Sequence, residues 1–148
     1  MKPHPYLRAY MAGTLVPTVF VMFVACGYAF IRYGLGLPFA IEKGLIFPVA
    51  FVPNLFGIWN VVYTKLHQTH HIALGVHGAL LPFVLGPLGL LVAFRVGLAQ
   101  FHDGSLIYFQ AIRVPYGVLA IGFVCALIVY YLVWKYVVGY LNEVVGVA

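Results

Sequence analysis

Residues 114–134 read VPYGVLAIGFVCALIVYYLVW, a run without a charged side chain. A membrane-spanning helix needs about 20 consecutive, mostly apolar residues, so this run is long enough to cross a bilayer. Three further runs free of Asp, Glu, Lys and Arg cover residues 9–31, 44–64 and 66–94. The sequence therefore predicts an all-α, polytopic integral membrane protein whose four transmembrane helices form one bundle.

The composition agrees with this fold class. Hydrophobic residues make up 64% of the chain and charged residues only 7%, whereas a soluble domain carries about 25% charged residues. A transmembrane β-barrel would show alternating apolar and polar segments of about 10 residues, and these runs are continuously apolar. We expect residues 1–148 to form a single transmembrane domain, with helices at about 9–32, 44–65, 70–98 and 114–138.

The charges lie at the ends of the apolar runs. Eight Lys and Arg residues against three Asp and Glu residues give a net charge of +5, which favours a bilayer with anionic headgroups as a partner. Because the basic residues form no clustered face, we expect no nucleic-acid binding. Four spans place both termini on one side, and the basic residues divide equally between the two sides. We expect a bacterial inner (plasma) membrane with both termini in the cytoplasm.

The connecting segments have separate signals. Residues 96–112 are expected to form a loop, with a turn at His102-Asp103-Gly104-Ser105. Pro48 and Pro53 fall inside the second predicted helix, where the missing N–H and the bulky ring of proline disturb helical geometry. We expect a kink or a local irregularity there.

The third predicted helix carries a stripe of small residues on one face. At 3.6 residues per turn these residues fall within an arc of roughly 80°, and small residues let membrane helices approach closely. We expect this stripe to make the closest helix contact in the molecule, either within the chain or as a hinge or oligomer interface. Its packing residues are Gly75, Ala79, Gly86, Gly89, Ala93 and Gly97.

Two amides lie in the second predicted helix, Asn54 and Asn60. An unpaired amide in hydrocarbon costs several kcal/mol, so both should be hydrogen-bonded inside the bundle. They would serve either as polar contacts between helices or as the lining of a substrate path.

Four histidines lie in the first part of the third apolar run: His67, His70, His71 and His77. If residues 66–78 form one helix, the spacing of four residues puts His67 and His71 on one face as the likeliest ligand pair. Imidazole pairs can hold a transition metal or haem. His70 and His77 would then contact either the ligand histidines or the lipid headgroups. Alternatively the four rings form a polar interfacial collar or a pH-responsive element.

The pattern His67-x-x-His70-His71 resembles one histidine box of the membrane fatty-acid desaturases and hydroxylases. That resemblance covers five residues and would imply a di-iron site. These enzymes have three boxes, and His4, His77 and His102 are isolated and form no second one. We therefore do not assign the chain to that family.

The four apolar runs contain no acidic residue, although transporters and proton pumps commonly place Asp or Glu in their spans. We expect a non-catalytic membrane protein that acts through helix packing, as a homo-oligomer or as a subunit of a larger membrane complex. The first alternative is a redox or metal-handling protein that uses the histidines. The second alternative is a small channel or carrier.

Overall fold

The computed structural model describes residues 4–36, 40–67 and 72–147. Within them, four helical spans are long and apolar enough to cross a membrane. This confirms the predicted fold class, to which the structure adds a small three-stranded sheet. The spans are Pro5–Gly34, Glu42–Leu66, Leu74–Arg95 and Tyr116–Val145.

The first span consists of α1 (Pro5–Ala29), which continues as a π-helical turn, η1 (Phe30–Gly34). The second span is divided into α2 (Ile41–Ala50) and α3 (Val52–Leu66), which meet at Phe51. Pro53 lies in the first turn of α3, where a proline needs no N–H partner. The break therefore falls where the two prolines predict an irregularity.

The third span is also divided, into α4 (Leu74–Ala79) and α5 (Pro82–Arg95). The assumption of one helix over residues 66–78 is wrong, because α3 ends at Leu66 and Ala73 has an extended backbone before α4 begins.

The end of α5 has a clear backbone cause. Gly97 has a positive φ of 69°, a conformation that suits glycine at the end of a helix. The N–H of Gly97 then bonds to Phe94 O (3.1 Å) and the N–H of Leu98 to Ala93 O (2.7 Å). This pair of bonds is a Schellman motif, and it stops the helix before the predicted boundary at residue 98.

The segment predicted as a loop contains a sheet instead. Strands β1 (Ala99–His102), β2 (Ser105–Tyr108) and β3 (Ile112–Pro115) pair antiparallel in the order β1-β2-β3. The β1–β2 turn is Asp103-Gly104, both with positive φ (40° and 71°). An Asp-Gly pair of this kind favours a tight hairpin, so the predicted turn is present but is flanked by strands.

The fourth span combines α6 (Tyr116–Leu132), a π-helical turn η2 (Val133–Val138) and α7 (Gly139–Val145). It extends beyond the predicted end at residue 138, as far as Gly146, whose left-handed backbone (φ 70°) closes the helix.

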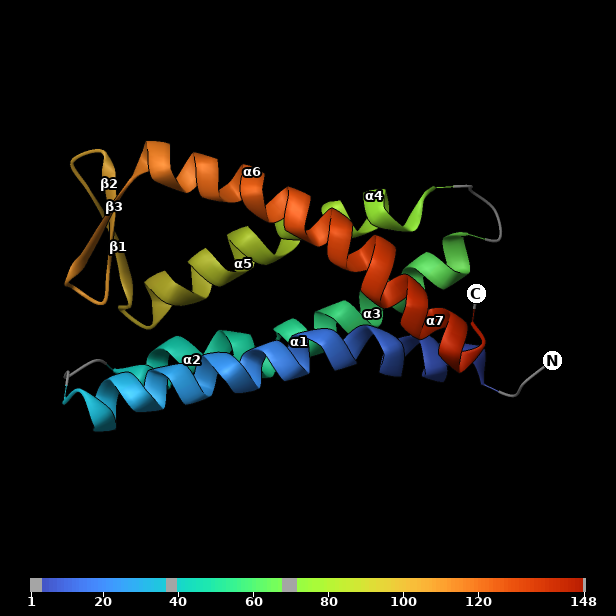
Figure 1. Ribbon diagram of the computed structural model, residues 1–148. Helices are drawn as coiled ribbons and strands as arrows, with labels where there is room; N and C mark the ends of the chain where they lie inside the picture. Colours follow the sequence, from blue (N-terminus) through green and yellow to red (C-terminus); the bar gives the residue numbers. More distant parts are fainter. Residues whose placement is uncertain (1–3, 37–39, 68–71, 148) are drawn as a thin grey trace.

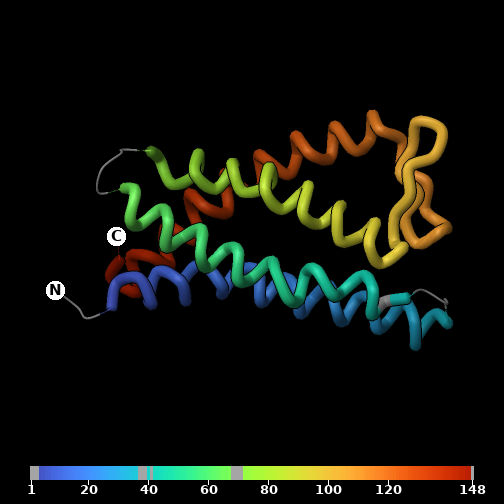
Figure 2. The backbone as a smooth tube through the Cα atoms, turned by 180° about the vertical axis from the view of Figure 1, so that it is seen from behind, coloured from blue at the N-terminus to red at the C-terminus, as the bar shows by residue number. Residues whose placement is uncertain are grey.

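The spans form two helical hairpins. Figure 1 shows α1 beside α2 and α3, and α5 beside α6, with the sheet joining α5 to α6. Both termini lie at the end opposite the sheet (Figures 1 and 2). Towards the sheet, α6 diverges from α1, whereas α5 lies close to α2 and the Phe109 ring contacts the Tyr28 ring. A core of Phe56, Leu81, Leu85, Trp134 and Val138 joins the second, third and fourth spans.

Candidate functional site

The histidines that the sequence singles out do not gather on one helix face. His67 follows the end of α3, is exposed, and stacks its ring on Tyr63 with 5.1 Å between ring centroids. His70 and His71 lie outside the described residues, so the ligand pair His67 and His71 stays a prediction. Among the described residues, no group of three or more His, Cys, Asp or Glu side chains is placed to hold a metal ion.

His77 has a different environment on α4, where it is buried. Its Nε2 donates to Trp59 O (3.3 Å), and Trp59 Nε1 donates to His77 O (2.9 Å). The two rings also stack with 5.1 Å between centroids. These reciprocal bonds tie α3 to α4.

Asn60 is completely buried on α3. Its Nδ2 donates both to Ala9 O (2.8 Å) and to Asn142 Oδ1 (2.7 Å), and Asn142 Nδ2 donates back to Asn60 Oδ1 (3.1 Å). The amide pair therefore joins α1, α3 and α7 near the termini. Asn142 was not predicted as a site residue, although an amide close to the end of an apolar run is a usable signal in the sequence.

Asn54 lies on the outer surface of the molecule rather than inside it. Its Oδ1 accepts a hydrogen bond from the Tyr10 hydroxyl, and its Nδ2 donates to Ala50 O (2.8 Å). The polar atoms of Asn54 are thus hydrogen-bonded within the chain, although its side chain is exposed rather than inside the bundle.

The tightest helix approaches involve glycines outside the predicted stripe. A Cβ on Gly13 of α1 would lie 2.7 Å from Phe56 O, and one on Gly57 of α3 would lie 2.6 Å from the Tyr10 ring. A Cβ on Gly78 of α4 would overlap the Cβ and Cγ atoms of Trp134. Glycine is therefore required where α1 packs on α3 and where the third span packs on the fourth.

The predicted stripe is not one continuous contact. A Cβ on Gly75 would lie 2.8 Å from the Tyr131 ring and one on Gly89 would lie 3.1 Å from the Phe47 ring. By contrast, a Cβ on Gly86 would meet only Phe123, at 3.8 Å, and Gly97 faces open space. The prediction that the stripe makes the closest helix contact in the molecule is therefore wrong at Gly86 and Gly97. Of the two alanines in the stripe, Ala79 is half-buried and Ala93 is buried.

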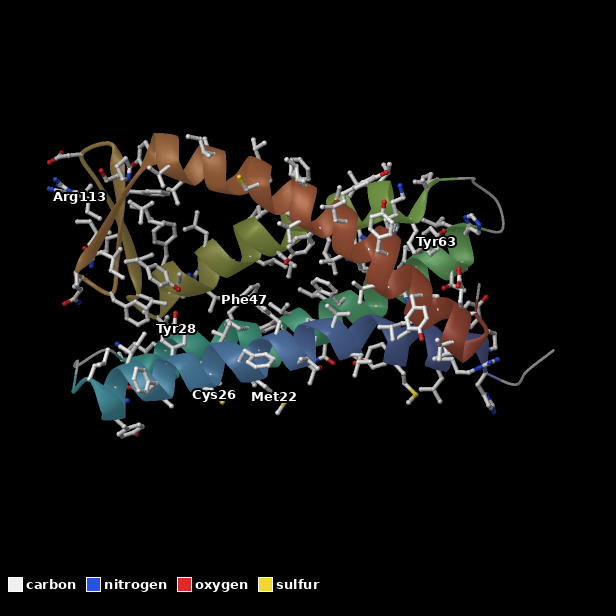
Figure 3. All side chains as sticks on the ribbon, viewed as in Figure 1. Met22, Cys26, Tyr28, Phe47, Tyr63 and Arg113 are labelled. Carbon is white, nitrogen blue, oxygen red and sulfur yellow. The ribbon has the colours of Figure 1, made fainter. Side chains whose placement is uncertain are left out.

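A concave, mostly apolar feature lies between the two hairpins. We call it the inter-hairpin groove. Its wider part is an apolar cavity of about 480 Å³ between α1, α2, α3, α5 and α6, and its narrower part is a cavity of about 290 Å³ between α2, α5 and the sheet. Both parts are lined by Phe47, Pro48, Leu85 and Gly86, and Figure 3 shows Phe47 pointing into the space between the hairpins.

Polar groups meet this groove at its sheet end. Lys43 and Tyr108 line the narrower part. Burial raises the pKa of Tyr108, with a smaller contribution from Tyr28, so the Tyr108 hydroxyl stays protonated at neutral pH and can donate a hydrogen bond. The neighbouring carboxylate of Glu42 is bonded to Arg32 at 2.6 Å. No pattern in the sequence predicted the groove.

No known family model, curated protein or solved structure matches this chain. The fold itself defines the chain as a candidate integral membrane protein with four transmembrane helices.

Proposed function

We propose that the chain is a non-catalytic integral membrane protein that acts through helix contacts, as a homo-oligomer or as a subunit of a larger membrane complex. One observation carries the proposal: α6 has no buried residue over its whole length. Its outer surface is apolar, with Ile121 67% exposed. Gly117 and Gly122 of α6 have open space where a side chain would be. In lipid, close packing at small residues is a main force that joins helices.

The polar interior supports a structural role rather than a reaction. The buried polar side chains among the described residues are Asn60, His77, Ser105 and Asn142. Asn60, His77 and Asn142 use their side-chain atoms in hydrogen bonds that join helices. We place the protein in a bacterial plasma membrane with both termini in the cytoplasm, the commoner arrangement for an even number of spans.

Cross-linking through the natural cysteines tests the proposed oligomer. Cys125 lies on α6 and Cys26 on α1, and both are exposed; Figure 3 shows Cys26 pointing away from the other helices. A bismaleimide applied to membranes should convert Cys26→Ser, which keeps Cys125, into a dimer of the 16.3-kDa chain. Cys125→Ser, which keeps Cys26, should give little dimer, because the proposal puts the contact on α6.

Two results would argue against this account. If only Cys125→Ser forms the dimer, the contact is on α1 and its assignment to α6 is wrong. If neither variant cross-links and native mass spectrometry of the wild type from mild detergent shows only the monomer, self-association is wrong.

A further inference from the structure

We propose that the inter-hairpin groove binds one acyl chain of an anionic membrane lipid, with its headgroup beside Lys43. This inference goes beyond the proposed function, since a monomer and an oligomer could both bind such a lipid.

The size of the groove suits a hydrocarbon ligand. Its wider part alone, at about 480 Å³, falls within the usual range of about 300–1,000 Å³ for ligand pockets. Apolar side chains such as Phe20, Phe123 and Val129 line it. When the groove is empty, the atoms that line it lack dispersion contacts on one side. An apolar occupant would supply these contacts and stabilise the packing of the two hairpins.

The groove opens towards the bilayer rather than towards water. Phe20 of α1 and Val129 of α6 both line the wider cavity, yet they are 65% and 54% exposed. Both lie in the middle of membrane-spanning helices. A molecule that enters between α1 and α6 must therefore come from the hydrocarbon of the membrane.

The length of the groove matches one leaflet. Its lining runs along α2 and α3 from Lys43 to Phe56, which spans about 20 Å at 1.5 Å per residue. Half of a hydrocarbon core about 30 Å thick is about 15 Å, so this path accommodates one chain with its headgroup at the surface. At the deep end, Phe56 packs on Tyr130 and Trp134, with ring centroids 5.5 and 5.7 Å apart.

The charge at the sheet end favours an anionic headgroup. Among the described residues that line the groove, Lys43 alone is charged at neutral pH, and an ammonium group attracts phosphate oxygens. The sheet end of the molecule as a whole carries more basic than acidic side chains, since Arg32, Lys43, Arg95 and Arg113 stand against Glu42 and Asp103. The Tyr108 hydroxyl adds a hydrogen-bond donor at the same place.

Photolabelling in nanodiscs tests the proposal. The probes are phosphatidylglycerol and phosphatidylcholine, each with a diazirine in the acyl chain, added separately to the full-length protein in the same host lipid. With phosphatidylglycerol, peptide mapping should place the label on groove residues such as Phe47, Leu85 and Phe123. Phosphatidylcholine should label these residues about fivefold less, the ratio expected when the attraction of one lysine to an anionic headgroup is lost.

Two substitutions separate the groove from the rest of the surface. Gly86→Leu places a side chain in both parts of the groove, where a Cβ meets only Phe123 at 3.8 Å, so it should abolish groove labelling and preserve the fold. Gly27→Leu is the matched control, because Gly27 faces open space and does not line the groove. Lys43→Gln should remove the preference for phosphatidylglycerol and keep labelling by phosphatidylcholine.

Three results would overturn the proposal. The first is label on the outward face around Met22 and Cys26 as strong as that in the groove. The second is labelling of Gly86→Leu equal to that of Gly27→Leu, with both variants monodisperse. The third is an unchanged preference for phosphatidylglycerol in Lys43→Gln, which would reject Lys43 as the headgroup contact.

Discussion

Replacing Gly78 by alanine is expected to abolish the stably folded protein. A Cβ at this position of α4 would overlap the Cβ and Cγ atoms of Trp134, which lie next to the backbone of η2 and cannot turn away. Gly78 and Trp134 are both buried. Overpacking usually costs about 1–3 kcal/mol and more when the backbone must shift, against a typical stability of about 5–15 kcal/mol.

Thermal unfolding in detergent, together with size-exclusion chromatography, measures this effect. Gly78→Ala should lower Tm strongly or yield only aggregated protein. Gly27→Ala is the matched control, since Gly27 also lies within a helix but faces open space, and its Tm should equal or exceed that of the wild type. A Gly78→Ala protein with the Tm of the wild type would show that the third and fourth spans are not packed as described.

Replacing Asn60 by alanine is expected to have the next largest effect. The change removes the hydrogen bonds to Ala9 O and Asn142 and leaves the Asn142 amide buried without its partner. A buried polar group without a partner costs about 1–3 kcal/mol. Asn54→Ala is the control, because Asn54 is exposed, and it should cost less than Asn60→Ala.

A double-mutant cycle separates the pair from its surroundings. Asn60→Ala and Asn142→Ala should each lower the free energy of unfolding in an SDS titration, with Asn60→Ala the more harmful because it also loses the bond to Ala9 O. The double variant should cost clearly less than the two single costs added, since neither change then strands a partner. Additive costs would contradict the reciprocal amide pair.

The sequence was a good guide to the spans and to the break in the second one. The spans were predictable because charged side chains are excluded from hydrocarbon, a constraint that acts on each apolar run separately. The break was predictable because proline perturbs a helix locally. The sheet was missed because its strands have four residues each, too few to show an alternating pattern. The prediction that residues from Gly75 to Gly97 form one packing stripe was wrong in part, because it assumed one regular helix. The span instead breaks before Pro82 and ends at a Schellman motif.

The candidate site was less predictable because it depends on residues distant in the chain. The cost of an unpaired amide suggested that Asn60 needs a partner, but Asn142 lies 82 residues away. The role of His77 depends on Trp59 in the preceding span. The inter-hairpin groove arises because α6 diverges from α1 towards the sheet, and no local pattern of residues indicates that divergence.

We expect the sheet and the chain ends to lie on opposite sides of a membrane, and the accessibility of introduced cysteines measures this topology. In a Cys26→Ser, Cys125→Ser background, Arg113→Cys places a thiol on the sheet and Lys65→Cys places one at the end of α3, both at exposed positions; Figure 3 shows Arg113 at the sheet end. In intact cells, a membrane-impermeant maleimide should label Arg113→Cys at once and Lys65→Cys only after permeabilisation. The reverse pattern would keep the four spans but place the termini outside. Equal labelling of both thiols in intact cells would contradict the transmembrane bundle.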